Sequence, residues 1–217
     1  MIHFSNVTKK YKNGYEGLKR VDFDLDNGEM VFLTGHSGAG KSTFLKIAGM
    51  LESATRGQVE VNGFDLMNLK PRHLPQFRRK IGIVLQDPKL LPKQTAFENV
   101  CLPLIVAGAR KNEMKKRARA AIDKVGLLRK ENLLAEELST GEQQRIGLAR
   151  AIVNKPDLIL ADEPTGNLDP DLSKEIMQLF ADFNSVGTSI LIVTHDVDLI
   201  RTLPYRNVHI EDGRLIE

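Results

Sequence analysis

The chain has 217 residues, of which 41% are hydrophobic and 27% charged, and its net charge is +3. These values are typical of one folded domain with a substantial core, here residues 1–217, and they exclude long disordered or low-complexity segments. The net charge is too small to indicate nucleic acid without a dense basic patch, so we expect no nucleic-acid partner.

The apolar runs are too short to cross a membrane. The longest, residues 100–109 and 189–194, fall well below the ~20 residues that a spanning helix needs. Residues 1–5 lack a basic region followed by an apolar run, so we expect no secretory signal. Cys101 is the single cysteine of the sequence and cannot form an internal disulfide, which favours a reducing cytosol.

The N-terminal segment is rich in β-forming residues. Short strands are predicted over residues 2–7, 21–25 and 58–61. Asn-Gly pairs, which favour tight turns, stand at positions 13–14, 27–28 and 62–63. We interpret this pattern as an antiparallel β lobe beside the main sheet.

An apolar strand over residues 30–34 leads into a glycine-rich loop and a helical run over residues 41–50. The loop has the spacing of a phosphate-binding loop, although a glycine-rich turn between strand and helix is the structural alternative. In a phosphate loop, backbone amides and the helix N-terminus attract the anion, Lys41 reaches the β and γ phosphates, and Ser42 can ligate magnesium. The predicted nucleotide-binding residues are Gly35, His36, Ser37, Gly38, Ala39, Gly40, Lys41, Ser42 and Thr43.

A helical lobe is predicted over about residues 88–140, inserted in the core. Apolar residues recur at helical spacing among basic ones, most clearly over residues 112–125. The basic residues form a solvated helix face, or they contact anionic lipid headgroups or an acidic partner loop. They are Arg110, Lys111, Lys115, Lys116, Arg117 and Arg119.

A further helix is predicted over residues 142–153, ended by Pro156. Ser139 and Glu142 have the spacing of a capping box, which as structure is an ordinary helix start. As chemistry, it is a second helix N-terminus that offers Ser139 and glycine-flanked amides to a phosphate. A monomer that binds one nucleotide has no evident use for two phosphate-binding helix N-termini.

Two more apolar strands, residues 158–162 and 189–194, complete the pattern of an α/β fold with a mainly parallel central sheet. They lead into Asp162-Glu163 and His195, and ligands bind at the carboxyl edge of such sheets. Asp162 is placed to hold magnesium and Glu163 to polarise an attacking water, although adjacent acids can also cap a turn. A hairpin around an Asp-Gly pair is predicted over residues 208–216.

Together these segments resemble the ATP-binding-cassette ATPases, whose signature matches Leu138-Ser139-Thr140-Gly141-Glu142-Gln143. The resemblance implies a P-loop NTPase fold with an N-terminal antiparallel β lobe and an inserted helical signature lobe. It implies an ATPase with ATP and Mg²⁺ as cofactors. It also implies a head-to-tail homodimer, in which the signature of one subunit completes the ATP site of the other through Ser139, Thr140, Gly141 and Glu142.

The resemblance also implies roles for residues outside these motifs. Gln86 corresponds to the Q-loop glutamine, which contacts the magnesium or water, and His195 to the switch histidine that holds the γ-phosphate. Asp169 belongs to the D-loop across the dimer interface. Tyr11 corresponds to the adenine-stacking aromatic, with Tyr15 close by. The implied catalytic residues are Glu163, His195 and Gln86, and the implied magnesium ligands are Ser42, Gln86 and Asp162.

Thr140 departs from the family pattern, which has two glycines after the signature serine. A β-branched residue restricts the backbone and crowds the phosphate if this position needs a positive φ. We therefore expect slower hydrolysis, or a weaker dimer, than in relatives with both glycines.

Within the family, the phosphate-loop interior His36-Ser37-Gly38-Ala39 resembles that of the bacterial cell-division branch. This branch implies the integral membrane protein FtsX as a partner, docked on the helical lobe at residues 90–92 and 97–104, with division-ring proteins as further partners. It implies a peripheral protein on the cytoplasmic face of the inner membrane at the septum, whose conformational changes activate peptidoglycan hydrolases.

Two alternatives remain for the biological role. One is the ATPase subunit of a lipoprotein-release or macrolide-efflux complex, which a different co-purifying membrane protein would reveal. The other is a soluble cassette protein working on nucleic acid or ribosomes. Such proteins usually carry two cassettes or long insertions, and this sequence has neither.

Overall fold

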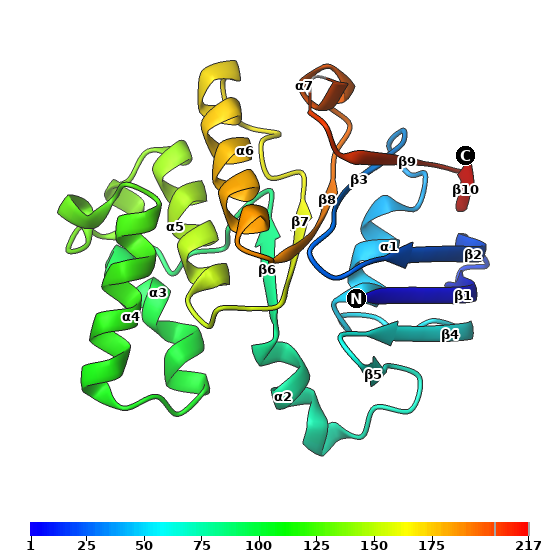
Figure 1. Ribbon diagram of the computed structural model, residues 1–217, viewed down its shortest axis with the longest axis horizontal. Coiled ribbons are helices and arrows are strands. Elements are labelled where there is room, and N and C mark those ends of the chain that lie inside the picture. The colour runs from blue at the N-terminus through cyan, green and yellow to red at the C-terminus, as the bar shows by residue number, and fades with distance from the viewer. Residues whose placement is uncertain (202, 217) are drawn as a thin grey trace.

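Two β-sheets organise the computed structural model, which describes residues 1–201 and 203–216 (Figure 1). The smaller sheet is antiparallel, with the strand order β2-β1-β4-β5. Its strands are β1 (Ile2–Lys10), β2 (Glu16–Leu25), β4 (Arg56–Val61) and β5 (Phe64–Asp65). This sheet is the antiparallel N-terminal lobe predicted from the sequence.

The larger sheet has the order β10-β9-β3-β8-β7-β6, and all its neighbouring pairs are parallel except β9 with β10. Its strands are β3 (Met30–Thr34), β6 (Ile81–Leu85), β7 (Leu158–Asp162), β8 (Ser189–Val193), β9 (Arg206–Glu211) and β10 (Arg214–Ile216). The predicted α/β fold with a mainly parallel sheet is therefore confirmed.

The central strands are apolar because both of their faces are covered. In β3, Met30 and Phe32 pack into one hydrophobic core, whereas Val31 and Leu33 pack into a second core on the opposite face. The strands β7 and β8 alternate in the same way, as the two-residue period of a strand requires.

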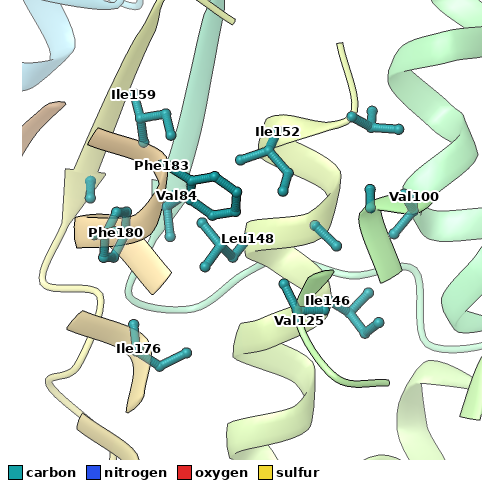
Figure 2. Packing of buried hydrophobic residues seen from close by; sticks show 14 of the residues in the cluster. Val84, Val100, Val125, Ile146, Leu148, Ile152, Ile159, Ile176, Phe180 and Phe183 are labelled. Atoms are coloured by element: carbon teal, nitrogen blue, oxygen red, sulfur yellow. The ribbon is translucent and has the colours of Figure 1, made fainter. Parts of the chain in front are cut away.

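Helices cover the two faces unequally. Helix α1 and the antiparallel sheet lie on one side, and the longer helices lie on the other (Figure 1). Figure 2 shows the core on the second side, where Phe180 and Phe183 lie beside residues of β6, β7 and α5. The helices are α1 (Lys41–Ala48), α2 (Leu74–Arg79), α3 (Ala96–Val106), α4 (Lys111–Lys124), α5 (Thr140–Ile152), α6 (Pro170–Ser185) and α7 (Val197–Arg201).

The helices α3, α4 and α5 pack against one another, and α5 also packs against β6. α5 thus joins this group of helices to the central sheet. The limits of the inserted helical lobe, about residues 88–140, stay a prediction. In residues 1–201 and 203–216, no helix combines the length and the apolar character that crossing a bilayer requires.

Candidate active site

A cavity of about 580 Å³ lies at the carboxyl ends of the central strands. It is lined by the glycine-rich loop before α1, by the residue that follows β6, and by residues after β7 and β8. The lining residues are Tyr15, Ser37, Gly38, Gly40, Lys41, Ser42, Thr43, Gln86, Glu163 and His195. The topology therefore brings together the phosphate-loop, Gln86, Glu163 and His195 segments, which are far apart in the sequence.

The glycine-rich loop is wrapped around a buried lysine. The Lys41 Nζ donates hydrogen bonds to the carbonyl oxygens of Gly35 at 2.7 Å and His36 at 3.0 Å. Gly40 has φ +116°, and a Cβ atom there would lie 2.4 Å from the Gly17 carbonyl oxygen. Only glycine fits this position, so the loop stays narrow enough to bring its backbone close to a phosphate.

Asp162 is the last residue of β7 and belongs to the same edge. Burial raises the pKa of its carboxyl group, and the charge of Glu163 adds to this shift, while a hydrogen bond with Ser42 and the charges of Lys46 and Lys41 oppose it. Ionising this carboxyl group in the folded protein therefore costs free energy, although a serine hydroxyl and two ammonium groups lower that cost.

These donors fit a magnesium ion that arrives with a nucleotide. Among the described residues, no group of three or more His, Cys, Asp or Glu side chains is placed to hold a metal ion. Magnesium is usually bound by one or two carboxylates together with substrate phosphates and water, rather than by an all-protein cage. One carboxylate and one hydroxyl at this edge, Asp162 and Ser42, match that donor set.

Replacing Asp162 by asparagine is expected to stabilise the nucleotide-free protein. Because the pKa is raised, this group favours folding only below its unfolded pKa, and that contribution is lost as pH rises through the higher folded pKa. At pH 7 the neutral amide should raise the melting temperature by about 2–4 °C, and the gain should vanish in acid. Calorimetry between pH 4 and pH 7 measures this difference. Asp65→Asn is the control, since hydrogen bonding lowers the pKa of Asp65 and its replacement should give no gain.

Glu163 connects the end of β7 to the segment after β8. Its Oε1 lies 2.9 Å from the His195 Nδ1, and its Oε2 accepts a hydrogen bond from the His195 backbone N–H at 3.2 Å. Its backbone N–H donates to the Val193 carbonyl oxygen at 2.8 Å. Glu163 has φ +47°, an uncommon conformation for a residue other than glycine, and these contacts hold it there.

Gln86 and Asp169 have different surroundings. The Gln86 Nε2 donates to the Asn167 Oδ1 at 3.4 Å, so the residue after β6 contacts the loop before α6. The Asp169 Oδ1 accepts from the backbone N–H groups of Asp171 and Leu172 at 3.1 and 3.0 Å, and thereby caps α6. Asp169 does not line the cavity.

The signature residues Ser139, Thr140, Gly141 and Glu142 also do not line the cavity. Figure 1 shows α5 on the other side of β6 and β7 from α1. The predicted capping box is present, because the Ser139 Oγ accepts from the Glu142 N–H at 3.3 Å and the Glu142 Oε2 accepts from the Ser139 N–H at 3.1 Å. A hydrogen bond with Lys130 lowers the pKa of Glu142.

Thr140 and Gly141 are adjacent at the start of α5, and only the second position excludes a side chain. Thr140 does not adopt a positive φ, so its β-branched side chain causes no backbone strain, and this reason for expecting slower hydrolysis is removed. Gly141 is buried, and a Cβ atom there would lie 2.1 Å from the Leu172 Cδ2. The glycine needed for close packing is therefore the one the sequence retains.

Tyr15, rather than Tyr11, lines the cavity. The Tyr15 hydroxyl donates to the Gly38 carbonyl oxygen at 2.7 Å, and its ring is stacked on that of Tyr11 with centroids 6.0 Å apart. The Tyr11 hydroxyl lies 3.2 Å from the Thr43 Oγ1. The sequence feature that points to Tyr15 is the Asn13-Gly14 turn, because this turn reverses the chain and brings Tyr15 beside Tyr11.

The glycine-rich loop, Glu163 after β7 and His195 after β8 line one cavity, and a family comparison identifies the class of the protein. Residues 18–166 match the ABC transporter family. The chain therefore belongs to the ATP-binding-cassette family and is an ATP-binding ATPase of this class.

Individual relatives show which members of this family the chain resembles. The chain is 50% identical over 215 residues to the cell division ATP-binding protein FtsE of Escherichia coli K12, with 99% of this chain and 97% of that protein covered. It is 45% identical over 216 residues to FtsE of Bacillus subtilis, with 100% and 95% covered. A solved dimer of the ATP-binding cassette MJ0796, bound to ADP and Pi, superposes with a TM-score of 0.91 at 39% identity, covering 100% of this chain and 97% of that one.

Proposed function

We propose that this protein is the ATP-hydrolysing subunit of a membrane complex in bacterial cell division and that it acts with the integral membrane protein FtsX. The observation that carries the proposal is the near-full-length identity of 44–50% to cell division ATP-binding proteins of several bacteria. The protein would work as a peripheral subunit on the cytoplasmic face of the inner membrane, at the septum. Its conformational changes would activate peptidoglycan hydrolases outside the membrane.

The binding part of the site is the phosphate loop. Lys41 transfers its hydrogen bonds from the loop carbonyls to the β and γ phosphates of ATP, and Tyr15 with Tyr11 supplies aromatic surface for the adenine. Ser42, Asp162 and Gln86 would hold magnesium. Bound magnesium neutralises charge that develops on the transferred phosphoryl group.

The hydrolytic part of the site is the Glu163–His195 pair. Glu163 accepts the proton of the attacking water, because its carboxylate lines the cavity that holds the phosphate loop. His195 lies 2.9 Å from Glu163, so it can orient the carboxylate and hold the γ-phosphate with its other ring nitrogen.

A second copy of the chain would complete the site. Ser139 and Thr140 are exposed at the start of α5 and lie outside the cavity, and an exposed helix N-terminus suits a phosphate. A head-to-tail homodimer would bring these residues and Asp169 to the ATP of the partner. That the similar cassette MJ0796 forms a dimer supports this arrangement.

The surface that would receive FtsX lies beside the helical group. A groove of about 300 Å³ is lined by residues of α2, β6, α3 and α5, among them Phe77, Ile83 and Pro103. Leu91 is 47% exposed, whereas Val100 and Leu104 are fully buried and belong to the core. A cytoplasmic helix of the partner would pack its apolar face into this groove.

Affinity purification of a Glu163→Gln protein from its native membranes, with ATP and magnesium, tests the proposal. We expect FtsX to be the membrane protein recovered, and Lys41→Ala provides the control that should not form the ATP-bound state. Recovery of a lipoprotein-release or efflux permease instead would retain the ATPase and overturn its role in division.

A further inference from the structure

A second cavity, of about 770 Å³, lies at the opposite edge of the central sheet from the candidate active site. It is bordered by α4, by the ends of α5 and α6, and by residues 155–157 and 186–188, which precede β7 and β8. Its lining residues differ entirely from those of the phosphate-loop cavity. Its volume falls within the range of small-molecule sites, which is roughly 300–1,000 Å³.

The floor of this cavity is apolar. Ile152, Ile159 and Phe183 line it with exposed fractions of 8%, 0% and 7%. Figure 2 shows Ile152 on α5 and Phe183 on α6 on facing sides of the space between these helices. Val186 also lines the cavity and is 75% exposed, so an apolar ligand would bury apolar surface that is otherwise open to solvent.

Four cationic side chains also line the cavity, against one carboxylate, Asp157. Asp157 is already engaged, since its Oδ2 lies 3.5 Å from the Lys80 Nζ and accepts from the Asn62 Nδ2 at 3.2 Å. The cations are Lys116, Arg117, Lys124 and Lys155.

Most of this positive charge is uncompensated. Arg117 is already engaged, because it is paired with Glu113 at 3.1 Å and its Nη2 donates to the Val153 carbonyl oxygen at 3.0 Å and to the Asn154 Oδ1 at 3.2 Å. The three lysines carry the remaining positive charge. Lys124 lies 5.6 Å above the centroid of the Phe183 ring. Across residues 1–201 and 203–216, Lys116 and Lys155 form no ion pair.

Lys155 has a backbone conformation that is unusual for lysine. Its φ is +53°, in the left-handed region, and its N–H donates to the Ile152 carbonyl oxygen at 2.7 Å just after α5 ends. Glycine or asparagine adopts this conformation at lower cost, by about 1–2 kcal/mol for glycine. This turn after α5 places Lys155 among the residues that line the cavity.

We propose that this cavity binds a small amphipathic anion, meaning a phosphate or carboxylate group attached to an apolar body. The lysines would receive the anionic group, and the floor formed by Ile152, Ile159 and Phe183 would receive the apolar body. An inorganic anion leaves the floor in water, and a neutral apolar molecule leaves the cations uncompensated. This inference does not depend on the proposed role in cell division.

The probe is octyl phosphate, titrated calorimetrically into the full-length protein with ADP and magnesium present to occupy the phosphate loop. We expect saturable binding at one site, and binding about tenfold weaker or more for octyl glucoside and for inorganic phosphate. Equal affinity for octyl phosphate and octyl glucoside would overturn the proposal.

Three variants locate the binding site. The triple variant Lys116→Gln, Lys124→Gln, Lys155→Gln should weaken octyl phosphate about tenfold or more. The matched variant Lys93→Gln, Lys111→Gln, Lys115→Gln removes the same charge from exposed positions outside the cavity and should change the affinity less than about twofold. Ala120 is exposed on α4 and lines the cavity, so Ala120→Trp should fold normally and block binding. Equal weakening by both triple variants, or unaltered binding to a folded Ala120→Trp protein, would refute the assignment.

Discussion

Replacing Glu163 by glutamine is expected to lower the rate of ATP hydrolysis by about 10²- to 10⁴-fold while ATP still binds. The amide keeps the shape of the side chain beside His195 but cannot accept the proton of the attacking water. Because ATP is no longer consumed, the ATP-bound homodimer should accumulate. Phosphate release and light scattering with ATP and magnesium measure the two effects.

The control for this variant is Glu60→Gln, which removes an exposed carboxylate from β4. It should hydrolyse ATP at the parent rate. A Glu163→Gln protein that stays monomeric and fully active would refute both the assigned base and the shared site.

Replacing Lys41 by alanine is expected to lower the affinity for ATP by about 100-fold or more. The ammonium group is buried, and each charge-assisted hydrogen bond that it forms with a phosphate contributes about 1.5–3 kcal/mol. Fluorescence titration with a labelled ATP analogue measures the change in affinity.

Lys70→Ala, at an exposed lysine before α2, is the matched control and should bind ATP normally. Lys41 also donates to two loop carbonyls, so thermal melting of the variant should be measured beside its binding. Retained ATP affinity in a folded Lys41→Ala protein would count against the phosphate-loop assignment.

The sequence predicts the central strands well because their signal is local. β3 and β7 begin and end where predicted, since apolar runs covered on both faces stop at polar or glycine-rich residues. The predicted Asn62-Gly63 and Asp212-Gly213 turns have positive φ at both residues, as a tight hairpin requires.

Features that depend on the pairing of one strand with another were harder to predict. β1 and β2 are longer than expected because their partners extend the ladder through register irregularities, which no local pattern encodes. The start of α5 differs for a local reason. The helix begins at Thr140, two residues before the predicted start, because Ser139 is its N-cap, and the capping-box spacing of Ser139 and Glu142 is the sequence signal for that earlier start.

In the candidate active site too, some features follow from local sequence and others only from contacts made in the fold. The strand pattern predicts that the phosphate loop, Glu163 and His195 share one edge of the sheet, because parallel strands deliver them there, and the family resemblance adds Gln86. The Asn13-Gly14 turn indicates only that the two tyrosines lie close together, whereas the hydrogen bond from the Tyr15 hydroxyl to the Gly38 carbonyl oxygen determines which of them lines the cavity. The cavity at the opposite edge is lined by residues of the three helices α4, α5 and α6 and by several loops, so only the folded chain reveals it.

The contact between Gly141 and Leu172 has a consequence for how relatives can diverge. A Cβ atom at position 141 would lie 2.1 Å from the Leu172 Cδ2, so a methyl group fits there only if the leucine is shortened or displaced. Substitutions at the two positions should therefore be inherited together, with a larger residue at one accompanied by a smaller residue at the other. Thr140 is exposed at the start of α5, so this contact does not limit the size of the side chain at position 140.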